Sequence, residues 1–223
     1  MITHKTITLF NIRVFLLLIL GFILALYASW MTSAALGYGY SFWYGFYDSE
    51  QHIARFAPQN KYRQGFETTS VIEHKKLFQE IVESVHADGK GLQSIHYYYH
   101  GKAVSLLHEA EIIHLQDVAN LIDKLDLAGA IALLILLAGL IILRIHKVRP
   151  RWKVQLGIFV GLLIFVGLVV LIAGPTAVFY QLHVWIFPDD HQWFFYYQDS
   201  LMSTMMKAPD LFGGIGATLV GLG

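Results

Sequence analysis

The chain has 223 residues, of which 56% are hydrophobic and 14% are charged, and its formal net charge is zero. A neutral chain without a basic outward patch argues against nucleic acid as a partner. Because the chain has no cysteine, thiol nucleophiles, disulfides and an acylated cysteine of its own are excluded.

Long apolar segments predict membrane-spanning helices. Three of them cover residues 14–35, 127–145 and 154–174, each close to the roughly 20 residues that a helix needs to cross a hydrocarbon core of ~30 Å. The first segment exceeds the core of a signal peptide and lacks a small-residue cleavage site, so we expect a retained anchor. A fourth, glycine-rich span is expected over residues 208–223, although a helix of that length reaches only about 24 Å.

Basic residues predict how these spans are oriented. Two precede the first span, and five lie within or beside the short connection between the second and third spans. The positive-inside rule therefore places residues 1–13 and the loop 146–153 in the cytoplasm. Residues 36–126 and 175–207 are then extracytoplasmic and face outward together.

The first outward segment, residues 36–126, is long enough to form a small domain on the membrane. A capping-box pattern followed by helically spaced apolar residues predicts a helix over 71–86. Residues 95–99 and 102–107 have the pattern of a β-hairpin. Helical spacing returns near His108 and leads into the second span. The expected fold class is an α-helical polytopic membrane protein with four, and at least three, transmembrane helices and a small mixed α/β extracytoplasmic domain between the first two.

Polar side chains recur at helical spacing just before the second span. Glu111, His114 and Asp117 are three residues apart, so their side chains lie near one another on a helix. A carboxylate beside an imidazole raises its basicity, which a general base requires. A solvated polar face has the same spacing, so the pattern alone leaves both interpretations open.

His183 has a different setting, just after the third span. It follows the Gly174-Pro175 break and lies among aromatic and aliphatic residues. An ionisable side chain in such a setting is costly and therefore indicates a functional site. The alternative is an interfacial histidine hydrogen-bonded to a headgroup or a carbonyl. Under the predicted orientation His114 and His183 lie at the same membrane face, which suggests acid/base chemistry on a lipid-borne substrate.

The high histidine content, 11 residues, makes a metal site a rival hypothesis. No HExxH motif occurs, and His108 and His114 are six residues apart, which does not suit joint ligation from one helical face. A site assembled from separate segments stays open. The chain also has no GxSxG elbow, which argues against a serine hydrolase. We expect no metal and no cofactor.

Two motifs resemble those of a family of small bacterial membrane proteins, the lipoprotein intramolecular transacylases (Lit). The first, Glu-x-x-His-Met-x-Asp-Val in the family, is Glu111-Ile-Ile-His114-Leu-Gln-Asp117-Val118 here, with leucine in place of methionine. The second is a spaced set that comprises His183, Phe187, Trp193, Asp199, Leu201, Pro209 and Phe212. The order of the motifs, the span pattern and the large first outward segment match too, so the resemblance covers most of the chain.

The resemblance implies an activity. Members of the family move the sn-2 acyl chain of the diacylglyceryl group on a lipoprotein's N-terminal cysteine to the α-amine of that cysteine, which yields a lyso-form lipoprotein. The implied partners are the diacylglyceryl-modified lipoprotein and membrane lipid. The implied location is the bacterial cytoplasmic membrane, with the active site on its extracytoplasmic face.

The resemblance also implies roles for individual residues. The implied catalytic pair is His114 and His183. The residues expected to orient them are Glu111, Asp117 and Asp199. Those expected to contact substrate are Trp193, Tyr197 and Phe187. We expect His183 to act as the base and His114 as oxyanion stabiliser or proton relay, and the reverse assignment stays open.

The chemistry suits these side chains. An imidazole with a pKa near 6.5 accepts a proton from an attacking amine and returns one to the glyceryl oxygen. Both reacting groups belong to one substrate, so holding them at attack distance supplies much of the rate without an acyl-enzyme. Two alternatives remain: a phospholipid acyltransferase or lipase on the same scaffold, and a non-enzymatic metal-binding membrane protein.

Overall fold

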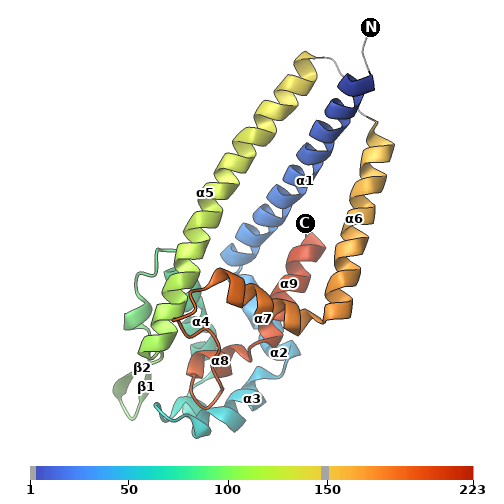
Figure 1. Cartoon of the computed structure of the whole chain (residues 1–223). Coiled ribbons are helices and arrows are strands. Elements are labelled where there is room, and N and C mark those ends of the chain that lie inside the picture. Colours follow the sequence, from blue (N-terminus) through green and yellow to red (C-terminus); the bar gives the residue numbers. More distant parts are fainter. Residues whose placement is uncertain (1–3, 147–150, 223) are drawn as a thin grey trace.

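A computed structural model describes residues 4–146 and 151–222 of the chain (Figure 1). Among these residues, three helices are long and apolar enough to cross a membrane: α1 (His4–Ala35), α5 (Glu109–Ile145) and α6 (Trp152–Ala173). Both α5 and α6 pack against α1. The three predicted spans are therefore present as helices. Part of the predicted cytoplasmic segments, residues 1–3 and 147–150, lies outside the described residues.

Helix α5 joins the site-bearing segment directly to the second span. With 37 residues it is about 55 Å long, well beyond the ~30 Å of a hydrocarbon core. Its first turns therefore extend beyond the span, and Glu111, His114 and Asp117 lie on this extension. The predicted helix from His108 and the second span are one continuous helix.

The expected fourth span is represented by the shorter helix α9, Asp210–Leu222. Its 13 residues extend about 20 Å, which is less than a full crossing. The helix packs on α1, where the Ser29 hydroxyl donates to the carbonyl oxygen of Leu219 at 3.3 Å. In Figure 1 it lies between α1 and α6. A fourth crossing is therefore not confirmed.

The segment between α1 and α5 forms a small α/β unit. It contains α2 (Tyr40–Phe46), α3 (Ser49–Phe56), α4 (Val71–Val85) and the antiparallel strands β1 (His96–Tyr99) and β2 (Lys102–Ser105). The helix predicted over 71–86 and the β-hairpin are confirmed, although the second strand ends two residues early. The Ser70 hydroxyl caps α4 by accepting from the Glu73 amide at 3.2 Å. Short 3-10 turns lie at Gly37–Gly39, Ala57–Gln59, Phe66–Thr68 and Leu92–Ser94.

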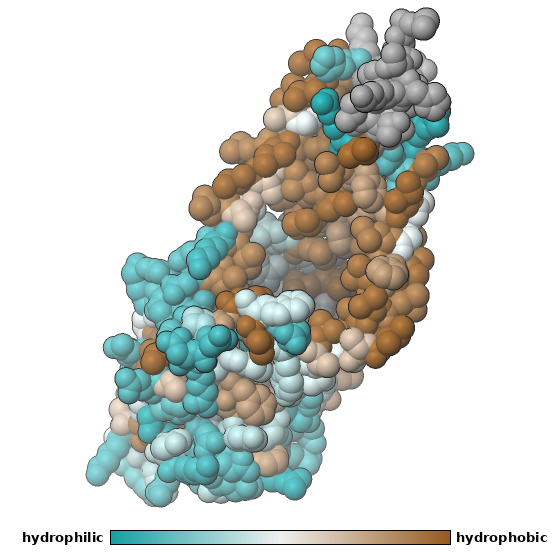
Figure 2. Space-filling view, in the orientation of Figure 1, coloured by the Kyte–Doolittle hydropathy of each residue, from teal (hydrophilic) through white to brown (hydrophobic). Residues whose placement is uncertain are grey.

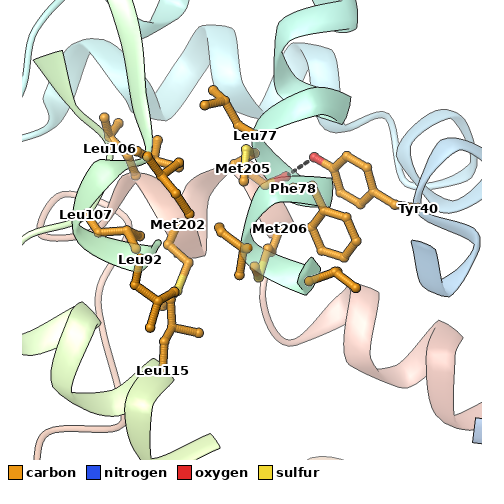
Figure 3. Close-up of a cluster of buried hydrophobic side chains, with 14 of the residues drawn as sticks. Tyr40, Leu77, Phe78, Leu92, Leu106, Leu107, Leu115, Met202, Met205 and Met206 are labelled. Atoms are coloured by element: carbon orange, nitrogen blue, oxygen red, sulfur yellow. Dashed lines mark hydrogen bonds between the residues drawn. The ribbon is translucent and has the colours of Figure 1, made fainter. Parts of the chain in front are cut away.

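Two further helices follow α6. Helix α7, Pro175–Ile186, begins at the predicted Gly174-Pro175 break and turns across the end of α6 (Figure 1). Helix α8, Leu201–Met206, has every residue buried. It packs against α3 and α4, and Figure 3 shows Leu106, Leu107 and Leu115 near Met202 of this helix. The Tyr40 hydroxyl donates to the carbonyl oxygen of Met205 at 2.8 Å. The core of the small unit is therefore completed by residues from the far end of the chain.

The surface divides into two zones. On the face drawn in Figure 2, hydrophobic residues cover most of the length of the three long helices, and hydrophilic residues cover the small α/β unit. Transfer of the first zone into lipid is favourable and transfer of the second is costly. Helix α7, which carries His183, lies where the zones meet (Figures 1 and 2).

Candidate active site

A largely apolar cavity of about 430 Å³ lies between the long helices and the small unit. Its walls come from the end of α1, from α4, the first turns of α5, α7, α8 and α9. On α5, His114, Val118 and Ile122 line it at intervals of four residues, so the cavity follows one face of that helix for two turns. It is large enough for a small-molecule ligand, and its apolar walls suit hydrocarbon.

The two predicted catalytic histidines meet in this cavity. His114 comes from α5 and His183 from α7, and both side chains line the wall. Their ring centroids are 6.4 Å apart. The prediction that these histidines converge is therefore supported by the geometry, and the rings face the same space.

The hydrogen bond of His183 fixes which nitrogen is free. Its Nδ1 lies 2.8 Å from the carbonyl oxygen of Phe179, one turn earlier in α7. A carbonyl only accepts, so Nδ1 carries the proton and the neutral ring presents the Nε2 lone pair. Burial lowers the pKa of His183 below its ordinary value, and the bond to Phe179 opposes that shift only in part. The ring is therefore neutral near pH 7, as a general base must be.

His114 is the more deeply enclosed of the pair. Its side chain is buried, and its Nδ1 has no hydrogen-bond partner. A buried, unpaired ring nitrogen costs stability, and such costs concentrate at functional sites. Other atoms of the His114 side chain line the cavity, so the ring lies within reach of a bound substrate.

Aromatic rings surround both histidines. Phe187 lies 4.9 Å from the His114 ring and 5.2 Å from the His183 ring, and Trp193 lies 5.0 Å from His183 (centroid distances). Both line the cavity, in keeping with their expected contact with substrate. Tyr197 does not line it. Its hydroxyl donates to the Ala208 carbonyl at 2.7 Å, and its ring packs on His52 and Phe56.

The three carboxylates expected to orient the histidines contact other groups. The fully buried Glu111 accepts from the His108 amide, the Ser200 hydroxyl and the Met202 amide, and so joins α5 to the start of α8. Asp117 accepts from His191 Nδ1 at 2.6 Å. Asp199 forms a 2.7 Å ion pair with Lys61. None of the three is hydrogen-bonded to His114 or His183.

Sequence reasoning missed several cavity residues. Phe179, the partner of His183, and Phe195, 6.0 Å from His114, carry no polar signal that a sequence pattern would reveal. Ser203 of α8 also lines the cavity, without a hydrogen bond to either histidine. His191, the partner of Asp117, belongs to neither of the two motifs. The roles of Phe195 and His191 depend on contacts between segments distant in sequence.

No grouping of three or more histidine, aspartate or glutamate side chains suited to a metal ion occurs within residues 4–146 and 151–222. His96 contacts the Ser94 carbonyl at 2.7 Å and the Tyr98 hydroxyl at 3.2 Å. The described residues therefore offer no positive support for the metal hypothesis.

Comparison with known proteins identifies a family. The family model described as "Lipoprotein intramolecular transacylase Lit" matches residues 66–208, which is more than half of the chain and includes both histidines. No curated protein and no solved structure matches the chain.

Proposed function

The chain belongs to the family of the lipoprotein intramolecular transacylase Lit and is thus an acyltransferase of lipoproteins, and on that premise we propose how it works. It transfers the sn-2 acyl chain of a diacylglyceryl-cysteine to the α-amine of the same cysteine. The lyso-form lipoprotein is the product. The observation that carries the proposal is the pair His114 and His183, which face one apolar cavity from two helices.

The proposed reaction is a direct transfer between two atoms of one substrate. The neutral amine attacks the ester carbonyl while His183 Nε2 accepts the proton that the nitrogen loses. The carbon–nitrogen bond forms and the carbon–oxygen ester bond breaks. The same proton then passes to the glyceryl oxygen, so the histidine ends as it began. His114 stabilises the oxyanion or relays the proton.

No acyl-enzyme is required in this scheme. The substrate itself supplies nucleophile and ester, and the protein contributes by holding them at attack distance. Ser203 is the cavity residue that a covalent route would use, but it has no hydrogen bond to either histidine to activate it. A Ser203→Ala variant is therefore expected to keep its activity.

The cavity suits the acyl part of this substrate. An apolar cavity of about 150 Å³ holds benzene, with six carbon atoms. By that proportion, the cavity of about 430 Å³ takes on the order of seventeen carbon atoms, close to one long acyl chain. We infer that one chain enters and that the rest of the lipid stays in the bilayer.

The membrane arrangement completes the proposal. The protein lies in the bacterial cytoplasmic membrane with residues 1–13 and 146–153 in the cytoplasm. Residues 36–126 and 175–207 are then extracytoplasmic, which places the cavity on the face where the lipoprotein N-terminus lies. The surface division supports this arrangement, because the small unit is hydrophilic and the long helices are not.

The test uses purified full-length protein and a synthetic diacylglyceryl lipopeptide with a free amine. Fragmentation mass spectrometry locates the acyl chain before and after incubation. We expect an N-acyl, lyso-glyceryl product, lost in His114→Gln and His183→Gln and kept in Ser203→Ala. An unchanged lipopeptide contradicts the proposal, and release of free fatty acid points instead to a lipase.

A further inference from the structure

The segment that joins α7 to α8 runs along the cavity without helix or strand (Figure 1). We call residues 188–195 the strap. Its last three residues, Trp193, Phe194 and Phe195, line the cavity wall. Ordering such a segment costs conformational entropy, so something must fasten it.

One polar contact fastens the strap to another element. His191 Nδ1 donates to Asp117 Oδ2 of α5 at 2.6 Å, between residues 74 positions apart in sequence. The bond also has the charges of an ion pair when the imidazole is protonated, and the bond itself raises the pKa of His191. Gln192 bonds only within the strap, to the Phe194 carbonyl. Across residues 188–195, all of them described, no other side chain is hydrogen-bonded to a different element.

The fastened point lies next to the ring that covers His183. Trp193 follows His191 by two residues, and its ring contacts His183 at 5.0 Å and Tyr180 at 5.7 Å between centroids. On its other sides His183 contacts Phe179 at 4.1 Å and Phe187 at 5.2 Å. Trp193 is the one of these three rings that is not on or directly beside α7, so its place depends on the strap.

We propose that Asp117 and His191 are positioning residues for the transfer reaction: their bond holds the strap so that Trp193 covers His183. The inference rests on the proposed function, since it assigns His183 as the base. Asp117 then acts through His191 and Trp193. It forms no hydrogen bond with His114, because its Oδ2 is bonded to His191 and the Nδ1 of His114 has no partner. The charge of Asp117 opposes the lowering of the His114 pKa by burial only in part.

Few charged or titratable side chains surround the Asp117–His191 bond and His183. Asp190 lies beside His191 in the strap, and Lys124 lines a small cavity of about 120 Å³ next to Asp117. The titratable groups that share the main cavity with His183 are His114 and the phenols of Tyr38 and Tyr180. No carboxylate of the described residues lines that cavity. Loosening the strap therefore changes the environment of His183 mainly by admitting water, which moves its pKa up towards the ordinary value.

The experiment removes the Asp117–His191 bond by substituting either partner. The variants are His191→Gln, Asp117→Ala and the double variant, all in the full chain, with Asp189→Ala as control because Asp189 is an exposed strap carboxylate. Two quantities are measured: kcat and KM with the diacylglyceryl lipopeptide, and the pKa of His183 by NMR of imidazole-labelled protein. A His183→Gln sample identifies its signal.

We expect kcat to fall about tenfold or more in each single variant and no further in the double variant, because the two residues act as a unit. The pKa of His183 rises in all three, the control changes neither quantity, and His191→Arg, which keeps a cation beside Asp117, restores much of kcat. Unchanged kcat, additive losses, or a fixed His183 pKa overturn the inference. An inactive wild-type protein refutes the proposed function instead, and the NMR titration still decides whether the pair shields His183.

Discussion

The two histidines of the cavity are held in different ways. His114 lies on α5 between Glu111, Leu115 and Ala119, which are all buried in the core of the small unit. Helix α7, in contrast, has no buried residue, and His183 is kept in place by its bond to Phe179 and by aromatic contacts. One histidine is therefore fixed by the folded core, and the other by contacts that a substrate can rearrange.

The largest effects are expected from leucine at each histidine. We expect His114→Leu and His183→Leu each to lower activity about 10²- to 10⁴-fold, the range of general acid–base catalysis. Their stabilities should differ. His114→Leu removes an unpaired buried nitrogen and should raise the unfolding free energy by about 1 kcal/mol, whereas His183→Leu should change it by less than about 0.5 kcal/mol. Thermal unfolding in detergent measures both changes. Equal stability changes would contradict the claim that only His114 is fixed by the folded core.

Glu111→Ala tests the claim that the folded core fixes His114 on α5. The change leaves three donors, two of them backbone amides, without their buried acceptor. We expect the free energy of unfolding to fall by about 3 kcal/mol, because each unsatisfied buried donor costs on the order of 1 kcal/mol or more. The matched control is Glu109→Ala, two residues earlier in α5 and exposed. Similar unfolding midpoints for the two variants would show that Glu111 does not hold α5 to α8.

The pH dependence of kcat tests the environment of His183 on α7. Because burial lowers the pKa of His183 below 6.5, its neutral form persists at pH 6.5 and is lost only at lower pH. We expect kcat to be level across pH 6.5–7.5 and to fall about tenfold per unit below the lowered pKa.

Circular dichroism at each pH separates this titration from unfolding. Burial also lowers the pKa of His74 in the small unit, to about 4. The unfolded chain takes up this proton below about pH 6.5 and the folded chain does not, so stability decreases as the pH falls towards 4. A fall in kcat that begins above pH 6.5 in fully folded protein would contradict a His183 whose pKa is lowered by burial.

The smallest effect is expected at the far end of the segment between α7 and α8. Asp199 forms its ion pair with the largely exposed Lys61, and exposed pairs contribute little. We expect Asp199→Asn to change kcat/KM by less than about threefold. A loss comparable to that of His191→Gln would mean that this end also positions the cavity wall.

The sequence was sufficient for the three long helices, for α4 and for the histidine pair. Apolar runs predicted α1, α5 and α6, and the Ser70 capping pattern predicted the start of α4. Convergence of His114 and His183 followed from their places beside two spans.

The partners of the carboxylates were beyond sequence reasoning. Spacing places Glu111 and Asp117 near His114 on one helix, but the groups that capture them, Ser200 and His191, lie 89 and 74 residues away. Such partners depend on how α8 and the strap pack against α5, which helical periodicity does not contain. Tyr197 is expected to contact substrate, but its hydroxyl and ring pack outside the cavity, on contacts that a sequence pattern does not contain.

The most direct test of the central claim is a crossover experiment. Two diacylglyceryl lipopeptides of different peptide mass, one with deuterated acyl chains, are incubated together with the full-length protein and analysed by mass spectrometry. Direct transfer within one substrate predicts that each N-acylated product keeps the isotopic label of its own peptide. Products that carry the other peptide's chain would show that acyl groups leave their substrate, and would contradict a transfer positioned between His114 and His183 on a single bound molecule.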